Sequence, residues 1–142
     1  MMISTRGRYA LRVLVDLAEQ NQNEYIPMKD VAARQEISLK YLERILPVLT
    51  KNGYVEAVHG KGGGYRLTHA PEAYRVGDIL RMTEGDLAPV SCLREDCAPC
   101  EKASSCRTHN MWVRFHETIN QFFDGITLAD LMQQSADERA LL

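Results

Sequence analysis

The stretch from Ser38 to Leu67, SLKYLERILPVLTKNGYVEAVHGKGGGYRL, decides the fold. Its first half predicts a helix that is capped by Ser38 and stopped by Gly53, because serine favours helix starts and glycine favours helix ends. Apolar residues at helical spacing give this helix a buried face, formed by Leu42, Ile45, Leu46 and Leu49. Pro47 predicts a kink or an irregular turn, because proline removes a backbone donor from a helix.

The second half of the stretch predicts a β-hairpin. YVEAVH and YRLT have the residue content of strands, and the segment between them holds four glycines and Lys61. A phosphate-binding nucleotide loop would instead need a Lys-Ser/Thr pair that opens a helix, whereas glycines and a strand follow Lys61. The segment is therefore interpreted as a hairpin with a flexible, basic tip.

Two further helices are predicted upstream of this stretch. Residues 5–19 carry apolar side chains around much of the helix surface, which is typical of a helix at the centre of a core. Pro27 is placed to open a short helix, MKDVAARQ, and a tight break at EI separates it from Ser38. The expected fold is mainly α with a small β-wing: a winged helix-turn-helix, with the helix-turn-helix at about residues 28–51 and the wing at about 54–68.

In such a fold the second helix of the pair enters the major groove of DNA, and its first exposed side chains reach the base edges. Lysine and arginine can bind phosphate or guanine, and glutamate can accept from cytosine. The wing can approach the DNA backbone or the minor groove. The alternative is that these polar side chains are ordinary solvated faces. The candidate DNA contacts are Ser38, Lys40, Tyr41, Glu43 and Arg44 on the helix, with His59 and Lys61 on the wing.

The charge distribution agrees with a polyanionic partner for the N-terminal part of the chain, residues 1–81. The net charge is −2, but residues 1–81 carry 12 Lys and Arg against 9 Asp and Glu, while residues 82–142 carry 5 against 10. No apolar run is long enough to span a bilayer, and charges interrupt the N-terminal apolar stretch, so we expect a cytoplasmic protein without membrane partners.

All four cysteines lie in one segment, SCLREDCAPCEKASSCRTH, at residues 91–109, with the spacing C-x4-C-x2-C-x5-C-x2-H. Disulfides are rare in the cytosol, so clustered cysteines there more often indicate metal binding or redox chemistry. An iron–sulfur cluster, a zinc site that uses C-x2-C and C-x2-H pairs, and a thiol switch with Cys97 and Cys100 as a redox pair all remain open.

Two more helices are predicted after the cysteine segment. Trp112, Phe115, Ile119 and Phe122 recur at spacings of three and four, which is the pattern of a helix that packs on another helix. Thr127 and Asp130 resemble a capping box that opens a last short helix, LADLM.

Several of these segments together resemble the Rrf2 family of winged-helix transcription regulators. They are STRGRYALRVLVDLA, the stretch from Ser38 to Leu67, VGDILR and ITLADL. The resemblance implies a homodimer that binds double-stranded DNA at a near-palindromic operator, and in which the helix near 110–124 crosses its partner.

The resemblance also implies a cofactor. Family members with cysteines hold an iron–sulfur cluster in the loop before the dimer helix, and those of the IscR type use three cysteines and one histidine on a 2Fe–2S cluster. Carried over to this chain, the implied ligands are Cys92, Cys100, Cys106 and His109. Cys97 is then an extra thiol and a possible alternative ligand, and a 4Fe–4S cluster or zinc stays open. Nitric-oxide-sensing relatives use an N-terminal carboxylate, whereas the corresponding place here is basic, around Arg8. The wing also departs from the IscR-like members, which often carry arginine where this chain has His59.

The expected organisation is a DNA-binding domain at residues 1–84, a cluster-binding loop at 85–109, a dimerisation helix with the short C-terminal helix at 110–134, and a tail at 135–142. The expected function is a regulator that senses iron–sulfur cluster, iron or redox status. The alternatives are a regulator with a thiol, nitric oxide or zinc signal, and an electron carrier. An enzyme is not expected, because the sequence shows no paired-carboxylate site, no nucleophile beside a base and no nucleotide loop.

Overall fold

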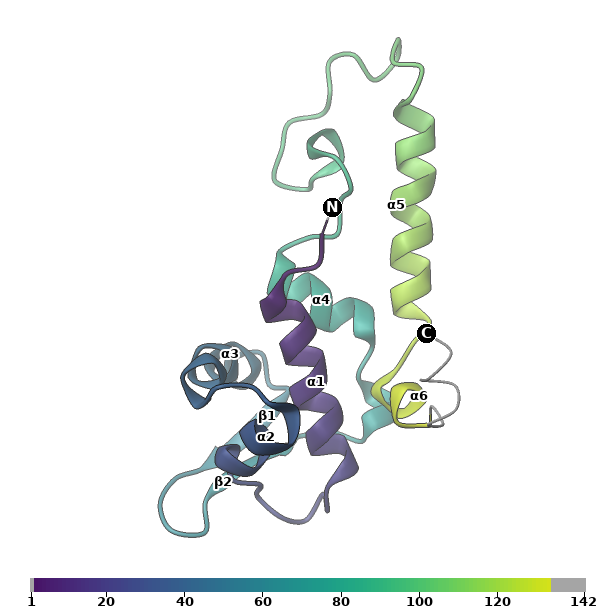
Figure 1. The fold of residues 1–142 in the computed structure, drawn as a ribbon. Helices are drawn as coiled ribbons and strands as arrows, with labels where there is room; N and C mark the ends of the chain where they lie inside the picture. Colours follow the sequence, from purple (N-terminus) through teal and green to yellow (C-terminus); the bar gives the residue numbers. More distant parts are fainter. Residues whose placement is uncertain (1, 134–142) are drawn as a thin grey trace.

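The computed structural model describes residues 2–133. The chain forms mainly helices and one small sheet (Figure 1). In chain order, the elements are α1 Thr5–Glu19, α2 Met28–Gln35, α3 Leu39–Lys51, β1 Val55–Val58, β2 Gly64–Leu67, η1 Pro71–Ala73, α4 Val76–Glu84, η2 Ser91–Leu93, α5 His109–Asp124 and α6 Leu128–Met132. The winged-helix prediction is therefore confirmed. The predicted tail at 135–142 lies outside the described residues.

The main core surrounds α1, as the broad apolar surface of that helix predicts. Ala10, Val13 and Leu14 are completely buried, and side chains from α2, α3, the sheet and α6 pack around them. The predicted buried face of α3 is confirmed, and α3 continues through Pro47 to Lys51 without a break in the helix. The apolar face of α3, rather than the proline, determines the extent of this helix.

The sheet is a two-stranded antiparallel hairpin in which Val55 pairs with Leu67 and Val58 pairs with Gly64. Val55 and Leu67 are buried, and they fix the register because a slip of one residue would turn them toward solvent. Tyr65 also forms a bridge with Ile26, just before α2. The hairpin is thereby attached to the helix-turn-helix as well as to α1.

A second, smaller core lies between α4 and α5. It consists of Val76, Leu80, Leu87 and Ile119, with Phe123 packed against it. Figure 1 shows α5 as a long helix whose C-terminal part lies beside α4. Its N-terminal part projects away from the other helices. None of the helices in residues 2–133 is long and apolar enough to cross a membrane.

The predicted apolar seam of α5 is partly buried and partly exposed. Ile119 is buried against α4, whereas Phe115 and Phe122 are 45% and 63% exposed. Met111, one turn before Phe115, is also exposed at 53%. Within residues 2–133, therefore, only part of this seam has a packing partner. The predicted capping box of Thr127 and Asp130 is present at the start of α6.

Candidate functional site

The recognition helix α3 presents one polar face to solvent. Ser38 caps the helix by accepting a hydrogen bond from the Tyr41 amide at 3.1 Å. Lys40, Glu43 and Arg44 are exposed, and they lie opposite the buried leucines of the same helix. The exposed side chains are thus of the kinds that bind phosphates and base edges, on a helix whose other face is fixed in the core.

Tyr41 differs from the other candidate contacts on α3. It is half-buried, and its ring packs edge-on against Tyr9 of α1, with 5.2 Å between the ring centroids. The guanidinium of Arg12 lies 5.1 Å from the centre of the Tyr9 ring. In this structure Tyr41 holds the first turn of α3 against α1, and its exposure is lower than the sequence pattern implies, because the Tyr9 ring covers it.

An ion pair between a buried carboxylate and a partly exposed arginine holds the end of α2 in place. Asp16 of α1 is 2% exposed, and its carboxylate accepts hydrogen bonds from Arg34 at 2.7 and 3.0 Å and from the side-chain amide of Gln35 at 2.9 Å. The hydrogen bond to Asp16 raises the pKa of Arg34 above its usual value. Arg12 donates to both the side chain and the backbone carbonyl of Gln35. Sequence reasoning did not identify this network, although an aspartate at an otherwise buried position of α1 is the signal that could have indicated it.

The turn between α2 and α3 depends on a left-handed residue. Glu36 has φ = 53°, which reverses the chain after Gln35 and brings Ile37 into the core. The Ile37 amide donates to the Ala32 carbonyl at 3.1 Å, which closes the end of α2. This turn sets the angle at which α3 leaves α2.

The wing tip is built almost entirely from glycine for steric reasons. Gly60 and Gly62 have positive φ values of 98° and 78°, which side chains disfavour. A Cβ on Gly63 would overlap the Val58 carbonyl, and one on Gly64 would overlap the Ile26 carbonyl. The tip is therefore a narrow, glycine-lined projection.

The predicted wing contacts, His59 and Lys61, are both exposed at this tip. At the base of the wing, Arg66 pairs with Glu56 at 2.5 Å, and its guanidinium lies 4.4 Å from the centre of the Tyr25 ring. Because Arg66 already has a carboxylate partner, the uncompensated positive charge of the wing is at its tip.

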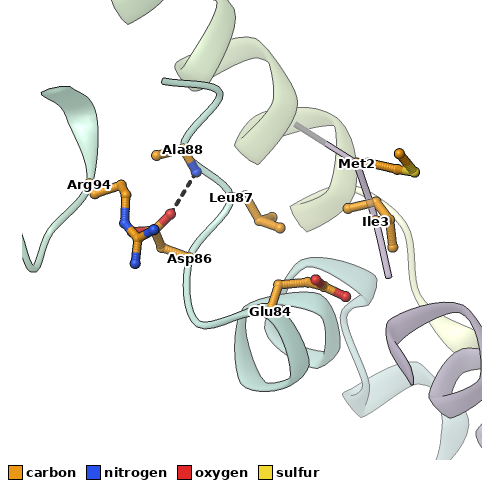
Figure 2. A pocket seen from close by; sticks show the side chains of 7 residues that line it. All are labelled: Met2, Ile3, Glu84, Asp86, Leu87, Ala88 and Arg94. Atoms are coloured by element: carbon orange, nitrogen blue, oxygen red, sulfur yellow. Dashed lines mark hydrogen bonds between the residues drawn. The ribbon is translucent and has the colours of Figure 1, made fainter. Parts of the chain in front are cut away.

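The cysteine loop is anchored at its start. Leu87 is buried in the second core, and the Asp86 carboxylate accepts from the Ala88 amide at 2.8 Å. Figure 2 shows this region, where Glu84, Asp86 and Arg94 surround a hollow of about 200 Å³ beside Met2 and Ile3. Arg94 is paired with Asp96. Beyond this anchor the loop passes through η2 and reaches α5.

The predicted metal ligands lie along this loop. Cys92 is at the centre of η2, Cys100 follows in irregular backbone, and His109 is the first residue of α5. Cys92 and Cys100 are half-buried, Cys97 and Cys106 are exposed, and all four thiols are free of disulfide bonds.

Cys106 has a distinctive environment. The Thr108 hydroxyl lies 3.4 Å from its sulfur, and a hydrogen bond from this hydroxyl lowers the pKa of the Cys106 thiol. The His109 amide donates to the Cys106 carbonyl, so Cys106 lies directly before the first turn of α5. A lowered pKa favours the thiolate, which is the form that binds metals and reacts with oxidants.

The donor set suits an iron–sulfur cluster chemically, since thiolates and a histidine nitrogen are established cluster ligands. The structure does not, however, bring three or more Cys, His, Asp or Glu side chains of residues 2–133 into a metal-binding group. The ligands are therefore chemically appropriate and sterically accessible, but a single chain does not gather them.

A capped recognition helix with an exposed polar face, next to a glycine-rich wing, defines a winged helix-turn-helix regulator that binds DNA. A family model described as Rrf2, an iron-dependent transcriptional regulator, matches residues 3–134. The chain belongs to the Rrf2 family of transcriptional regulators, in agreement with the resemblance of its sequence motifs.

Individual relatives support this assignment. Protein rrf2 of Nitratidesulfovibrio vulgaris is 38% identical over 136 residues, which cover 96% of this chain and 90% of that protein. The HTH-type transcriptional regulator IscR of Aliivibrio salmonicida is 36% identical over 132 residues, which cover 93% of this chain and 77% of the relative. These relatives are transcriptional regulators and not enzymes.

Solved structures are similar over almost the full length. CymR, the global cysteine regulator of B. subtilis, has a TM-score of 0.77 and 32% identity, and the match covers 95% of this chain and 98% of that one. T. potens IscR has a TM-score of 0.72 and 32% identity, and the match covers 100% of this chain and 92% of that one. Both similarities confirm the mainly helical, winged-helix fold.

Proposed function

We propose that this regulator is a homodimer that reads a near-palindromic DNA operator and senses iron–sulfur cluster status through its cysteine loop. The observation that carries the DNA-reading part is the exposed face of α3, where Lys40, Glu43 and Arg44 stand opposite a fully buried face. Residues 1–84 form the reading unit in this proposal, residues 85–109 the sensing loop, and residues 110–134 the dimerisation segment.

Each reading unit places α3 in the major groove. Ser38, Lys40, Glu43 and Arg44 contact bases or phosphates there, and Tyr41 keeps the first turn of α3 in position. The wing tip, with His59 and Lys61, approaches the backbone or the minor groove, since its glycines carry no side chains that would obstruct the approach. Glu43 acts mainly in selectivity, because a carboxylate near DNA is costly unless it meets a donor such as the cytosine amino group.

Two copies associate through the exposed stripe of α5. Met111, Phe115 and Phe122 are large, apolar and exposed, and with Thr118 they recur at the spacings of four and three that suit helix–helix packing. An apolar stripe that no other part of the described chain covers is unfavourable in water. A two-fold axis through the stripe would present two α3 helices to the two halves of one operator.

Cys92, Cys100, Cys106 and His109 would hold the cluster, most simply a 2Fe–2S cluster, with Cys97 as the alternative ligand. When bound, the cluster would supply a redox-active iron centre, whose reduction potential depends on its ligands and surroundings. Both ends of the cysteine loop are attached to helices or to the core of the chain. Leu87 and Asp86 fix its start to the second core, and its end continues directly into α5. Any reordering of the loop is therefore transmitted to the dimerisation helix, and it regulates DNA binding only if the two states differ in operator affinity.

A second signal, thiol oxidation, is favoured by one observation: the hydrogen bond that lowers the pKa of Cys106 in an exposed position. Metal-free protein would report this signal through its own thiols, whereas the cluster proposal requires iron. The two signals are distinguished by whether operator affinity follows iron loading or reversible oxidation of the metal-free protein.

DNA reading is tested by fluorescence anisotropy on fragments selected from random DNA, with the salt concentration varied. Wild-type affinity should fall steeply with salt, because phosphate contacts release counterions. Arg44→Gln should cost about 1–3 kcal/mol and relax base preference if Arg44 reads a guanine, or reduce the salt slope by about one if it contacts phosphate. Arg75→Gln is the matched control, since Arg75 is exposed at the start of α4, next to the α6 segment. Salt-independent binding by the wild type, or equal losses in both variants, would contradict the proposal.

A further inference from the structure

A polar cluster joins the reading unit to the dimerisation helix. Arg81 of α4 donates to Asn120 of α5 at 2.7 Å, and it forms an ion pair with Asp124, also on α5. Its third partner, Asp78 at 3.0 Å, lies on α4 itself. The hydrogen bond to Asp124 raises the pKa of Arg81, so the guanidinium is positively charged at every physiological pH. We refer to Gly77, Arg81, Asn120 and Asp124 as the α4–α5 joint.

At this joint the Asp124 side chain of α5 lies directly against Gly77 of α4, in the space that a side chain at position 77 would otherwise occupy. A Cβ on Gly77 would overlap the Asp124 carboxylate, and it would also lie 2.9 Å from the Arg81 guanidinium. Gly77 is buried in the described chain. The position of Asp124 is therefore fixed on one side by the backbone of α4 and on the other by Arg81.

Apolar contacts alone would leave the angle between the two helices less well defined. Beside the joint, Val76 and Leu80 of α4 pack against Ile119 of α5. Side chains of this kind tolerate small shifts, because the hydrophobic effect is not directional. A hydrogen-bonded guanidinium–carboxylate pair is directional, since it requires a particular geometry of donors and acceptors. The joint thus selects one register of α5 on α4.

In the proposed homodimer, on which this inference rests, the register of α5 on α4 determines how the two recognition helices are placed. α3 belongs to the reading unit, whereas the exposed stripe of α5 would meet the partner chain. The angle of α5 on α4 therefore sets the separation and the relative rotation of the two α3 helices. Half-sites one helical turn apart are separated by about 34–36 Å, or 10–10.5 base pairs, so one base pair changes the required rotation by roughly 34–36°.

We propose that Arg81 and Asp124 are positioning residues that determine which half-site spacing the dimer accepts. Neither residue needs to touch DNA for this role. The substitution of either partner frees α5 to rotate on its apolar contacts, so the dimer accommodates operators with a spacer one base pair shorter or longer.

The test is a spacer series. The preferred operator is first obtained with the wild-type protein by selection from random DNA, and its central spacer is then shortened or lengthened by one and two base pairs. Asp124→Asn should reduce the discrimination between the best and the neighbouring spacers by about three- to tenfold, which lies within the range of coupling that such contacts carry. Arg81→Gln should broaden the series at least as much, because it also removes the hydrogen bond to Asn120, and the double variant should broaden it no further than Arg81→Gln alone.

Asp78→Asn is the matched control. It removes an ion pair to the same guanidinium, but within α4, so it does not cross the joint and should retain the wild-type spacing preference. If Asp124→Asn unfolds, Arg81→Gln decides the test. An unchanged spacer series in the folded joint variants would overturn the proposal while the dimer remains. A wild-type protein that binds as one chain, without any spacing preference, would overturn the homodimer as well.

Discussion

Replacement of Asp16 by asparagine is expected to lower the free energy of unfolding by about 2–3 kcal/mol, because Asp16 is the buried acceptor that holds α2 to α1. The carboxylate accepts from Arg34 at 2.7 and 3.0 Å and from Gln35 at 2.9 Å. Asparagine has almost the same shape but only one acceptor atom, so an NH2 group would face the donors of Arg34 or Gln35. Hydrogen bonds to a charged group contribute roughly 1.5–3 kcal/mol each. The Arg34 side chain is 40% exposed, so water can solvate it again and the full value for two lost bonds is not expected.

Urea denaturation followed by circular dichroism gives this quantity, and all variants should be compared at one protein concentration because the proposed dimer couples folding to association. Glu19→Gln is the matched control, since it removes the same charge from an exposed position of the same helix, and we expect less than about 0.5 kcal/mol from it. An Asp16→Asn variant within about 0.5 kcal/mol of the wild type would refute the reasoning that this network fixes the helix-turn-helix.

Other predictions follow from single contacts. Glu36→Gly should raise the free energy of unfolding by about 0.5–1 kcal/mol in the same denaturation assay, since glycine adopts φ = 53° without strain; a loss of stability would contradict this. Thr108→Ala should shift the pH profile of Cys106 alkylation toward higher pH in reduced, metal-free protein, because the hydroxyl that lowers the thiol pKa is removed, and mass spectrometry would measure it; an unchanged profile would exclude the hydrogen bond as the cause. Phe115→Ser should weaken self-association at least about tenfold in sedimentation experiments, as expected for the loss of an aromatic side chain at the centre of an interface; equal association with the wild type would place the interface elsewhere.

Helix-capping and helix-stopping residues, which act over a few positions of the sequence, allowed much of the fold to be predicted. Ser38, Gly53 and the Thr127–Asp130 box are short-range signals, and the helix boundaries they imply agree closely with those of the structure. Pro47 was the exception, because the buried face of α3 outweighs one missing backbone donor.

The contacts between distant segments could not be predicted in this way. Asp16 and Arg34 meet only when α1 and α2 pack, and Arg81 and Asp124 are 43 residues apart. Tyr41 has the polar tip expected of a DNA contact, but it packs against a ring from α1 that the local pattern does not reveal. The seam of α5 was recognised as a packing surface, yet which part faces the chain itself depends on α4.

Metal and sulfide analysis of anaerobically purified protein tests the cluster-sensing claim most directly. We predict coloured wild-type protein with about two iron atoms and two sulfides per chain, the content of a 2Fe–2S cluster. Cys106→Ala should lose both the visible absorption and the iron, whereas Cys97→Ala should keep them. Wild-type protein that contains neither iron nor sulfide and cannot be reconstituted, or a Cys106→Ala variant that retains the full complement, would contradict the account.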